Sequence, residues 1–254
     1  ETKAAAERAR LLIEQAETLG EPPEDPLVLF SVLYGFFAAN YVAFNGDVIR
    51  NLTAQFLALA EKQRTTAPLM IGHRLMGASL VHTGEIAQGR VHYDQSLALF
   101  DPAVHRPLAM RFGQDIGVMT LSFRSWARWL LGYPEAALAD TDTALKDARG
   151  IGQAATLMFA LLNGSFTHIL RGDYAAANTE VDELAALADE KGALLWQAFG
   201  TSIRGCLLAL TGEASVHAIT SGIAAWRSTG ATVWMPLWVS HLARAYAALG
   251  QFAE

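Results

Sequence analysis

The sequence has few charged residues. They make up 17% of its 254 residues, against about a quarter in an average globular protein. Lysine and arginine number 19 and aspartate and glutamate 25, which gives a formal charge of −6 at pH 7. A nucleic-acid-binding surface needs clustered basic side chains, so we expect no nucleic-acid partner. Because 52% of the residues are hydrophobic, the chain can bury enough apolar surface to fold, which excludes a disordered segment.

The sequence also has only one cysteine and lacks the common catalytic motifs. The single cysteine, Cys206, excludes a disulfide-stabilised scaffold, and its apolar neighbours predict a packed core thiol. The glycine-rich phosphate loop and the G-x-S-x-G nucleophile elbow are both absent. The seven histidines include no pair with the H-E-x-x-H spacing, so we expect no metal site. We therefore expect a non-catalytic chain without a cofactor.

Long uninterrupted apolar runs do not occur. Residues 26–46 and 151–170 are uncharged and long enough to span a bilayer, but asparagine, serine and other polar residues interrupt both stretches. Such groups are costly in lipid, so we expect buried helices of a soluble protein and no membrane span. No signal peptide is recognisable, which predicts a cytoplasmic location. The chain starts with Glu1, and both ends read as interrupted helices, so we expect a piece of a longer polypeptide.

Glycine, in contrast, recurs at a regular interval. Six glycines each follow an apolar stretch: Gly46, Gly84, Gly132, Gly172, Gly212 and Gly250. Four of the five intervals measure 38 to 40 residues, and the fifth measures 48. A glycine at such a place suits the left-handed residue that ends a helix. The spacing predicts an all-α fold, a right-handed superhelix of about six antiparallel helix hairpins with a repeat near 40 residues.

Small side chains recur seven positions before each of these glycines. They are Ala39, Gly77, Ser125, Ser165, Gly205 and Ala243. Tetratricopeptide repeats place small residues at this position so that two antiparallel helices approach closely, and the segment 172–177 (GDYAAA) resembles the turn and second-helix opening of that family. The resemblance implies a single tetratricopeptide-like domain over residues 1–254. Because the first helix of each hairpin is nearly uncharged, we expect it on the inner, packed side.

The long interval contains an insertion. Its segment 100–107 (FDPAVHRP) holds two prolines and predicts a loop. The richest polar cluster lies around it, with two residues one hairpin earlier: His73, Arg74, His105, Arg106, Arg111, Gln114 and Asp115. Arginine and histidine side chains in this arrangement predict a site for a carboxylate or phosphate. In the alternative interpretation, Arg111 pairs with Asp115 four residues later and merely fixes the insertion.

Two further patterns concern helix starts and tryptophan. Asp25, Thr66, Asp115 and Thr232 are candidate helix caps. Six tryptophans, at positions 126, 129, 196, 226, 234 and 238, include pairs at helical spacing. Such a stripe indicates a core; the alternative is an inner groove that holds a partner helix or peptide.

Several segments together resemble a known multidomain family. They are 73–77 (HRLMG), 97–102 (LALFDP), 111–117 (RFGQDIG), 129–134 (WLLGYP) and 222–231 (GIAAWRSTGA). They resemble the C-terminal repeat region of bacterial proteins that carry an N-terminal class III adenylate/guanylate cyclase domain and a central ATPase domain. The resemblance spans the chain and is most specific over residues 73–134.

The family resemblance implies a regulatory role for this chain. Cyclase activity would belong to domains outside it, and none of their catalytic residues is present. The chain would bind a protein or peptide, or the parent protein's own ATPase or cyclase domains. The alternative is a sensor for a small anionic effector that controls those domains. The sequence makes no prediction of oligomeric state.

Overall fold

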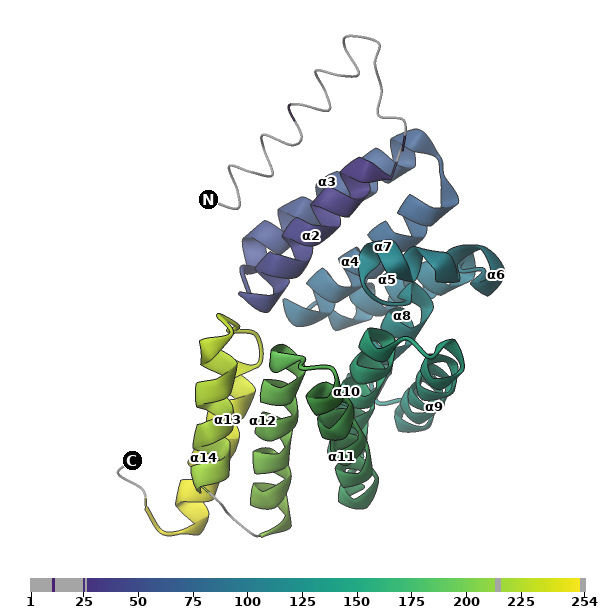
Figure 1. Ribbon diagram of the computed structural model, residues 1–254. Helices are drawn as coiled ribbons and strands as arrows, with labels where there is room; N and C mark the ends of the chain where they lie inside the picture. The colour runs from purple at the N-terminus through teal and green to yellow at the C-terminus, as the bar shows by residue number, and fades with distance from the viewer. Residues whose placement is uncertain (1–10, 12–24, 26, 213–215, 252–254) are drawn as a thin grey trace. The chain divides into compact units, whose positions relative to one another are not determined.

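The computed structural model describes residues 11, 25, 27–212 and 216–251. Within these ranges all regular structure is helical, which confirms the all-α prediction (Figure 1). The interrupted helices expected at residues 1–6 and 251–254 lie outside the described residues, apart from Gln251. Across the described ranges, no helix combines the length and the apolarity that crossing a bilayer requires. The chain divides into two compact units, residues 1–120 and 121–254.

The first unit consists of consecutive helices that pack on their neighbours. They are α2 (Val28–Val42), α3 (Gly46–Gln63), α4 (Thr66–His82) and α5 (Ile86–Leu99). Phe30, Phe56 and Ile71 are fully buried between them. The insertion follows α5. The predicted loop is wrong, because the segment forms α6 (Pro102–His105), a 3-10 helix (Arg106–Leu108) and α7 (Ala109–Phe112). Pro102 suits a first helical turn, and the Asp101 side chain accepts a hydrogen bond from the Ala103 N–H.

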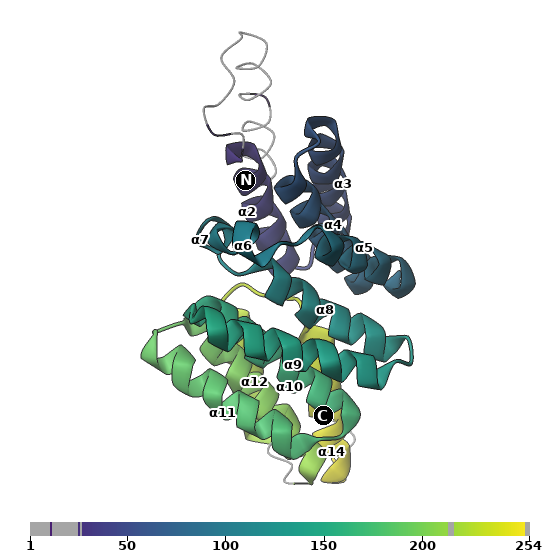
Figure 2. The same ribbon diagram turned by 90° about the vertical axis from the view of Figure 1, so that its right-hand side faces the viewer.

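The second unit repeats the same arrangement. After α8 (Ile116–Leu130), which spans the division between the units, come α9 (Pro134–Ile151), α10 (Ala154–Arg171), α11 (Tyr174–Glu190), α12 (Leu194–Thr211), α13 (Val216–Ser228) and α14 (Met235–Ala248). Consecutive helices from α9 to α14 pack on one another, and α12 also contacts α14. Figures 1 and 2 show this succession within the unit, from teal at α9 to yellow at α14. Most of the polar-interrupted stretch 151–170 belongs to α10, and most of that helix is buried.

The repeated glycines end helices as predicted at five of the six positions. Gly84, Gly132, Gly172, Gly212 and Gly250 all have φ between 71° and 96°. At Gly46 the prediction is wrong, since this residue begins α3 and the left-handed residue is Phe44, with φ 49°. The turn after α2 therefore comes two residues earlier than predicted, and it contains a hydrogen bond from the Asn45 N–H to the Asn40 carbonyl.

Small side chains allow close helix approach at four of the six predicted positions. Gly77, Ser125, Ser165 and Gly205 are buried. A Cβ atom on Gly205 would lie 2.9 Å from the Ile219 backbone, and one on Gly77 would lie 2.5 Å from the Tyr93 ring. The same prediction is wrong at Ala39 and Ala243. Both side chains are exposed because no described helix covers that side of α2 or α14.

One of the candidate helix caps is confirmed. The Asp115 carboxylate accepts a hydrogen bond of 2.8 Å from the Val118 N–H in the first turn of α8. Asp25 accepts one from the Leu27 N–H, but Leu27 is the residue that directly precedes α2, so the prediction of Asp25 as its cap is wrong by two residues. Thr66 is already inside α4 and Thr232 precedes α14 by three residues, so both of those predictions are wrong.

Candidate functional site

The predicted polar cluster is distributed over separate environments, beginning with His105 in the insertion. Its side chain is 4% exposed, and its Nδ1 accepts a hydrogen bond of 2.9 Å from the Asp101 N–H. The ring also lies 6.0 Å from the Phe100 ring. His105 therefore holds α6 in shape. Arg106 and Gln114 are half-buried in the same segment.

Arg111 joins the insertion to the start of α2. Its guanidinium forms an ion pair with the Asp25 carboxylate and donates a longer hydrogen bond of 3.4 Å to the Ser31 hydroxyl. The pKa of Asp25 is lowered, first by the Leu27 N–H and then by Arg111. The predicted pairing of Arg111 with Asp115 is thus replaced by a contact 86 residues away in sequence. Asp115 is buried, and its carboxylate caps α8 instead.

Arg74 lies inside the first unit among aromatic rings. Its side chain is 3% exposed, and its guanidinium carbon lies 5.9 Å from the centre of the Tyr34 ring and 6.0 Å from that of Phe37. Cation–π attraction at such distances strengthens when water is excluded. Tyr34 also packs edge-on against Phe112 of α7, with ring centres 5.1 Å apart. Tyr34 therefore links Arg74 to the insertion.

His73 faces a different neighbour, although it adjoins Arg74 in sequence. Its Nδ1 lies 3.0 Å from Nδ1 of His92 on α5. Burial lowers the pKa of both rings, and the proximity of His92 lowers that of His73 further. His73 therefore faces His92, whereas Arg74 faces the Tyr34 ring, so the structure does not bring these two consecutive residues together at one site.

A buried hydrogen-bonded pair near Arg74 carries no local sequence signal. His82 Nδ1 donates to the Ala78 carbonyl at 2.8 Å, so Nε2 accepts from the Tyr41 hydroxyl, also at 2.8 Å. Burial, with a smaller effect of Arg74, lowers the pKa of His82 to about 4, and burial raises the pKa of Tyr41. Both groups are therefore neutral at pH 7. Only the tertiary packing of the helices brings these two residues together.

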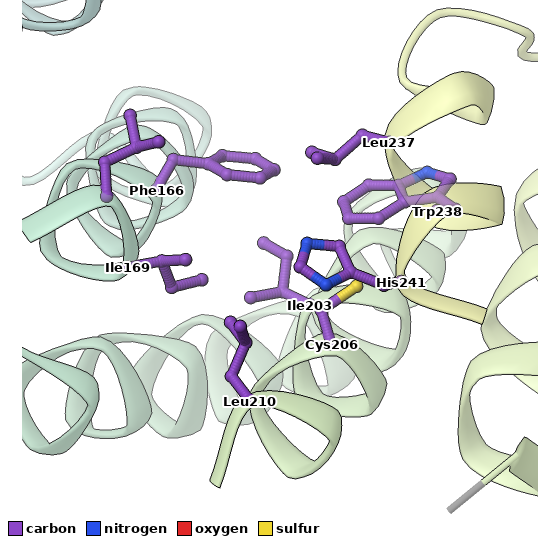
Figure 3. Close-up of a pocket in the computed structure, with 9 residues that line it drawn as sticks. Phe166, Ile169, Ile203, Cys206, Leu210, Leu237, Trp238 and His241 are labelled. Atoms are coloured by element: carbon purple, nitrogen blue, oxygen red, sulfur yellow. The ribbon is translucent and has the colours of Figure 1, made fainter. Parts of the chain in front are cut away.

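The second unit contains an apolar pocket of about 260 Å³ between α10, α12 and α14 (Figure 3). Its lining consists of Phe166, Ile169, Leu170, Ile203, Cys206, Leu210, Leu237, Trp238 and His241. Cys206 is 2% exposed, and burial raises the pKa of its thiol to about 12, which confirms the predicted core thiol. Sequence reasoning did not find this pocket, because its residues come from three helices and form no motif.

The tryptophans of the second unit belong largely to the core. Trp126, Trp226 and Trp238 are at most 6% exposed. The indole N–H of Trp126 donates to the Asn163 carbonyl at 3.1 Å, and that of Trp226 donates to the Val233 carbonyl at 2.8 Å. These contacts confirm the core interpretation for the three residues. The remaining tryptophans, at positions 129, 196 and 234, are half-buried.

In the part of the chain that the structure describes, no group of three or more His, Cys, Asp or Glu side chains is placed to hold a metal ion. The buried histidine pairs and Arg74 are engaged with neighbouring groups of the fold. A scan against protein-family models finds no match, and a search of curated proteins finds no relative.

Proposed function

We propose that this chain is a non-catalytic protein-interaction and regulatory region of a multidomain adenylate/guanylate cyclase signalling protein. In this proposal residues 1–254 form a single right-handed, tetratricopeptide-like superhelix of about six hairpins. The packing of consecutive helices and the glycine-ended turns support the repeat arrangement. The family resemblance of the segments between 73 and 134 supports the cyclase parent.

The insertion is the segment we assign to partner recognition. It presents Met110, which is 86% exposed, and Val104, which is 62% exposed. Exposed methionine is flexible and polarisable, and it suits surfaces that bind apolar side chains of a partner. The exposure of these apolar side chains on an inserted segment is the observation that carries the proposal.

Three contacts hold the insertion in a fixed shape. The Arg111–Asp25 ion pair ties it to the start of α2, Phe112 packs on Tyr34, and the buried His105 ring closes α6. A preordered segment loses less conformational entropy when it binds. The partner we expect is a protein or peptide with an apolar strip, or a surface of the parent protein's own ATPase or cyclase domain.

The anionic-effector alternative has less support. Arg111 has a carboxylate partner in the chain, Arg74 is buried among rings, and His73 faces His92. An incoming anion would have to displace Asp25 or disrupt the core. These charges therefore favour a structural role.

Site-specific photo-cross-linking in cells that make the natural full-length polypeptide tests the recognition segment. We expect benzoylphenylalanine at position 110 to cross-link to one protein or to another domain of the same polypeptide. The matched control is position 194, because Leu194 is 74% exposed at the start of α12. When benzoylphenylalanine is placed at position 104 instead, the substitution Met110→Glu should abolish the cross-linked product. Equal cross-linking at 110 and 194, or no effect of Met110→Glu, would contradict the proposal.

The parent assignment has a separate test. The coding sequence upstream of Glu1 should encode a class III cyclase domain followed by an ATPase domain. An upstream region without a cyclase domain would overturn the cyclase assignment and leave the interaction role to be judged by cross-linking.

A further inference from the structure

The apolar pocket between α10, α12 and α14 has the size and chemistry of a ligand site. We propose that it binds a neutral, mainly apolar small molecule that carries one hydroxyl or carbonyl group, and that this group bonds to the imidazole of His241. The inference does not depend on the proposed function, because all of the residues involved belong to the second unit.

The volume of the pocket sets the size of the ligand. It measures about 260 Å³, whereas an engineered cavity of about 150 Å³ lined by aliphatic and aromatic side chains binds benzene. A single substituted aromatic ring, or an acyl chain of similar volume, therefore fits. Larger ligands would have to displace the lining side chains.

The walls select an apolar, uncharged ligand. Ile203, Cys206 and Trp238 are each at most 2% exposed, and no lining residue carries a permanent charge. Leu170 is 38% exposed, so it lies at the rim, where a ligand would enter. In Figure 3 the Phe166 ring and the Leu237 side chain project toward one another across the space. A charged ligand would lose its hydration in this pocket without gaining a counter-ion.

His241 supplies a polar group to the pocket. Figure 3 shows its ring among the lining side chains, drawn beside Ile203 and Cys206 in this view. Its Nδ1 is buried and has no hydrogen-bond partner within the described residues. Burial, and to a smaller extent Arg244, lowers the pKa of His241, so the ring is neutral at pH 7. A neutral imidazole offers one donor and one acceptor, which a hydroxyl or carbonyl group of a ligand can satisfy.

Two probes of nearly equal shape test the site in the full 254-residue chain. Toluene and 4-methylphenol share a carbon skeleton and differ by one hydroxyl group. Because Cys206 is the only cysteine and lines the pocket, its reaction with methyl methanethiosulfonate, which forms a methyl disulfide on the thiol and releases methanesulfinate, reports occupancy when followed by mass spectrometry. We expect both probes to slow this disulfide formation saturably. We expect 4-methylphenol to bind about three- to tenfold more tightly, the ratio that one neutral hydrogen bond gives.

Substitutions assign the binding to the pocket. His241→Phe should remove the preference for 4-methylphenol and leave toluene binding. His217→Phe is the matched control, because His217 is exposed on α13 and should leave both affinities unchanged. Leu237→Trp should fill the space and abolish protection by both probes. If its circular dichroism spectrum indicates misfolding, Ile169→Trp fills the same space from α10.

Three results would overturn the inference. The pocket is not a ligand site if neither probe protects Cys206 up to its solubility limit. Protection that persists in a folded, filled variant would place binding elsewhere. An unchanged probe preference in His241→Phe would remove His241 from the site.

Discussion

Replacing either of two glycines on α12 by alanine should change stability in opposite directions. Gly205 and Gly200 are both buried, five residues apart. A Cβ atom on Gly205 would lie 2.9 Å from the Ile219 N and Cα atoms of α13, whereas one on Gly200 would meet only the Ala185 methyl, at 3.9 Å. Gly205→Ala should therefore destabilise the second unit, and Gly200→Ala should stabilise it.

The magnitudes follow from two competing effects. Replacing glycine by alanine inside a helix gains about 0.8–1 kcal/mol, because alanine loses less backbone entropy. Overpacking a close helix contact costs about 1–3 kcal/mol. At Gly205 the contacted atoms belong to the backbone, which cannot relieve the contact by a change of rotamer as a side chain can. We expect Gly200→Ala to raise the free energy of unfolding by up to about 1 kcal/mol. We expect Gly205→Ala to lower it by up to about 2 kcal/mol.

Urea unfolding followed by tryptophan fluorescence measures both effects. All six tryptophans lie in residues 121–254, so the signal reports the second unit. The midpoint should shift in opposite directions while the slope stays constant, which shows that stability rather than compactness has changed. If Gly205→Ala proves as stable as Gly200→Ala, the argument that Gly205 is required for close helix contact is refuted.

The remaining predictions concern buried polar groups of the second unit. Asp140→Asn should lower the free energy of unfolding by about 3 kcal/mol in urea titrations, because its carboxylate, which is 6% exposed, pairs with Arg124 at 2.7 Å. A loss below about 1 kcal/mol, as an exposed ion pair gives, would contradict the prediction. The pKa of His168 is raised, first by its hydrogen bond to Glu180, so the folded chain holds this proton more tightly than the unfolded chain. That stabilisation is complete below about pH 6.5 and is lost as pH rises through the raised pKa, so the free energy of unfolding should fall over that pH range. His168→Gln should flatten this fall in a plot of unfolding free energy against pH. A fall that is unchanged in His168→Gln would exclude His168 as its source. Cys206, with a thiol pKa of about 12, should be alkylated far more slowly at pH 9 than in the urea-unfolded chain; equal rates would show that the thiol is not buried.

Features that depend on local sequence were predictable. Helices, their approximate limits and five of the six glycine turns followed from apolar spacing and from the steric freedom of glycine at positive φ. The exception is Gly46, since the left-handed residue of that turn is Phe44, two positions earlier, and Gly46 begins α3.

Features that depend on distant partners were not predictable. The nearest acidic candidate for Arg111 in sequence was Asp115, yet Asp25 is its partner, because α7 packs on α2. His73 and Arg74 are consecutive residues and belong to different environments. The pocket draws on three helices, and no spacing within any one of them marks it.

By itself, therefore, the sequence determined that this chain is helical and that its turns recur, because helix periodicity and glycine stereochemistry act within a few residues. The tertiary structure alone decided which charges are neutralised, which rings are buried and where a cavity remains. The physical reason is that burial and pairing depend on side chains contributed by other helices. The clearest examples are the ion pair of Arg111 with Asp25 and the pocket that His241 and Cys206 line together.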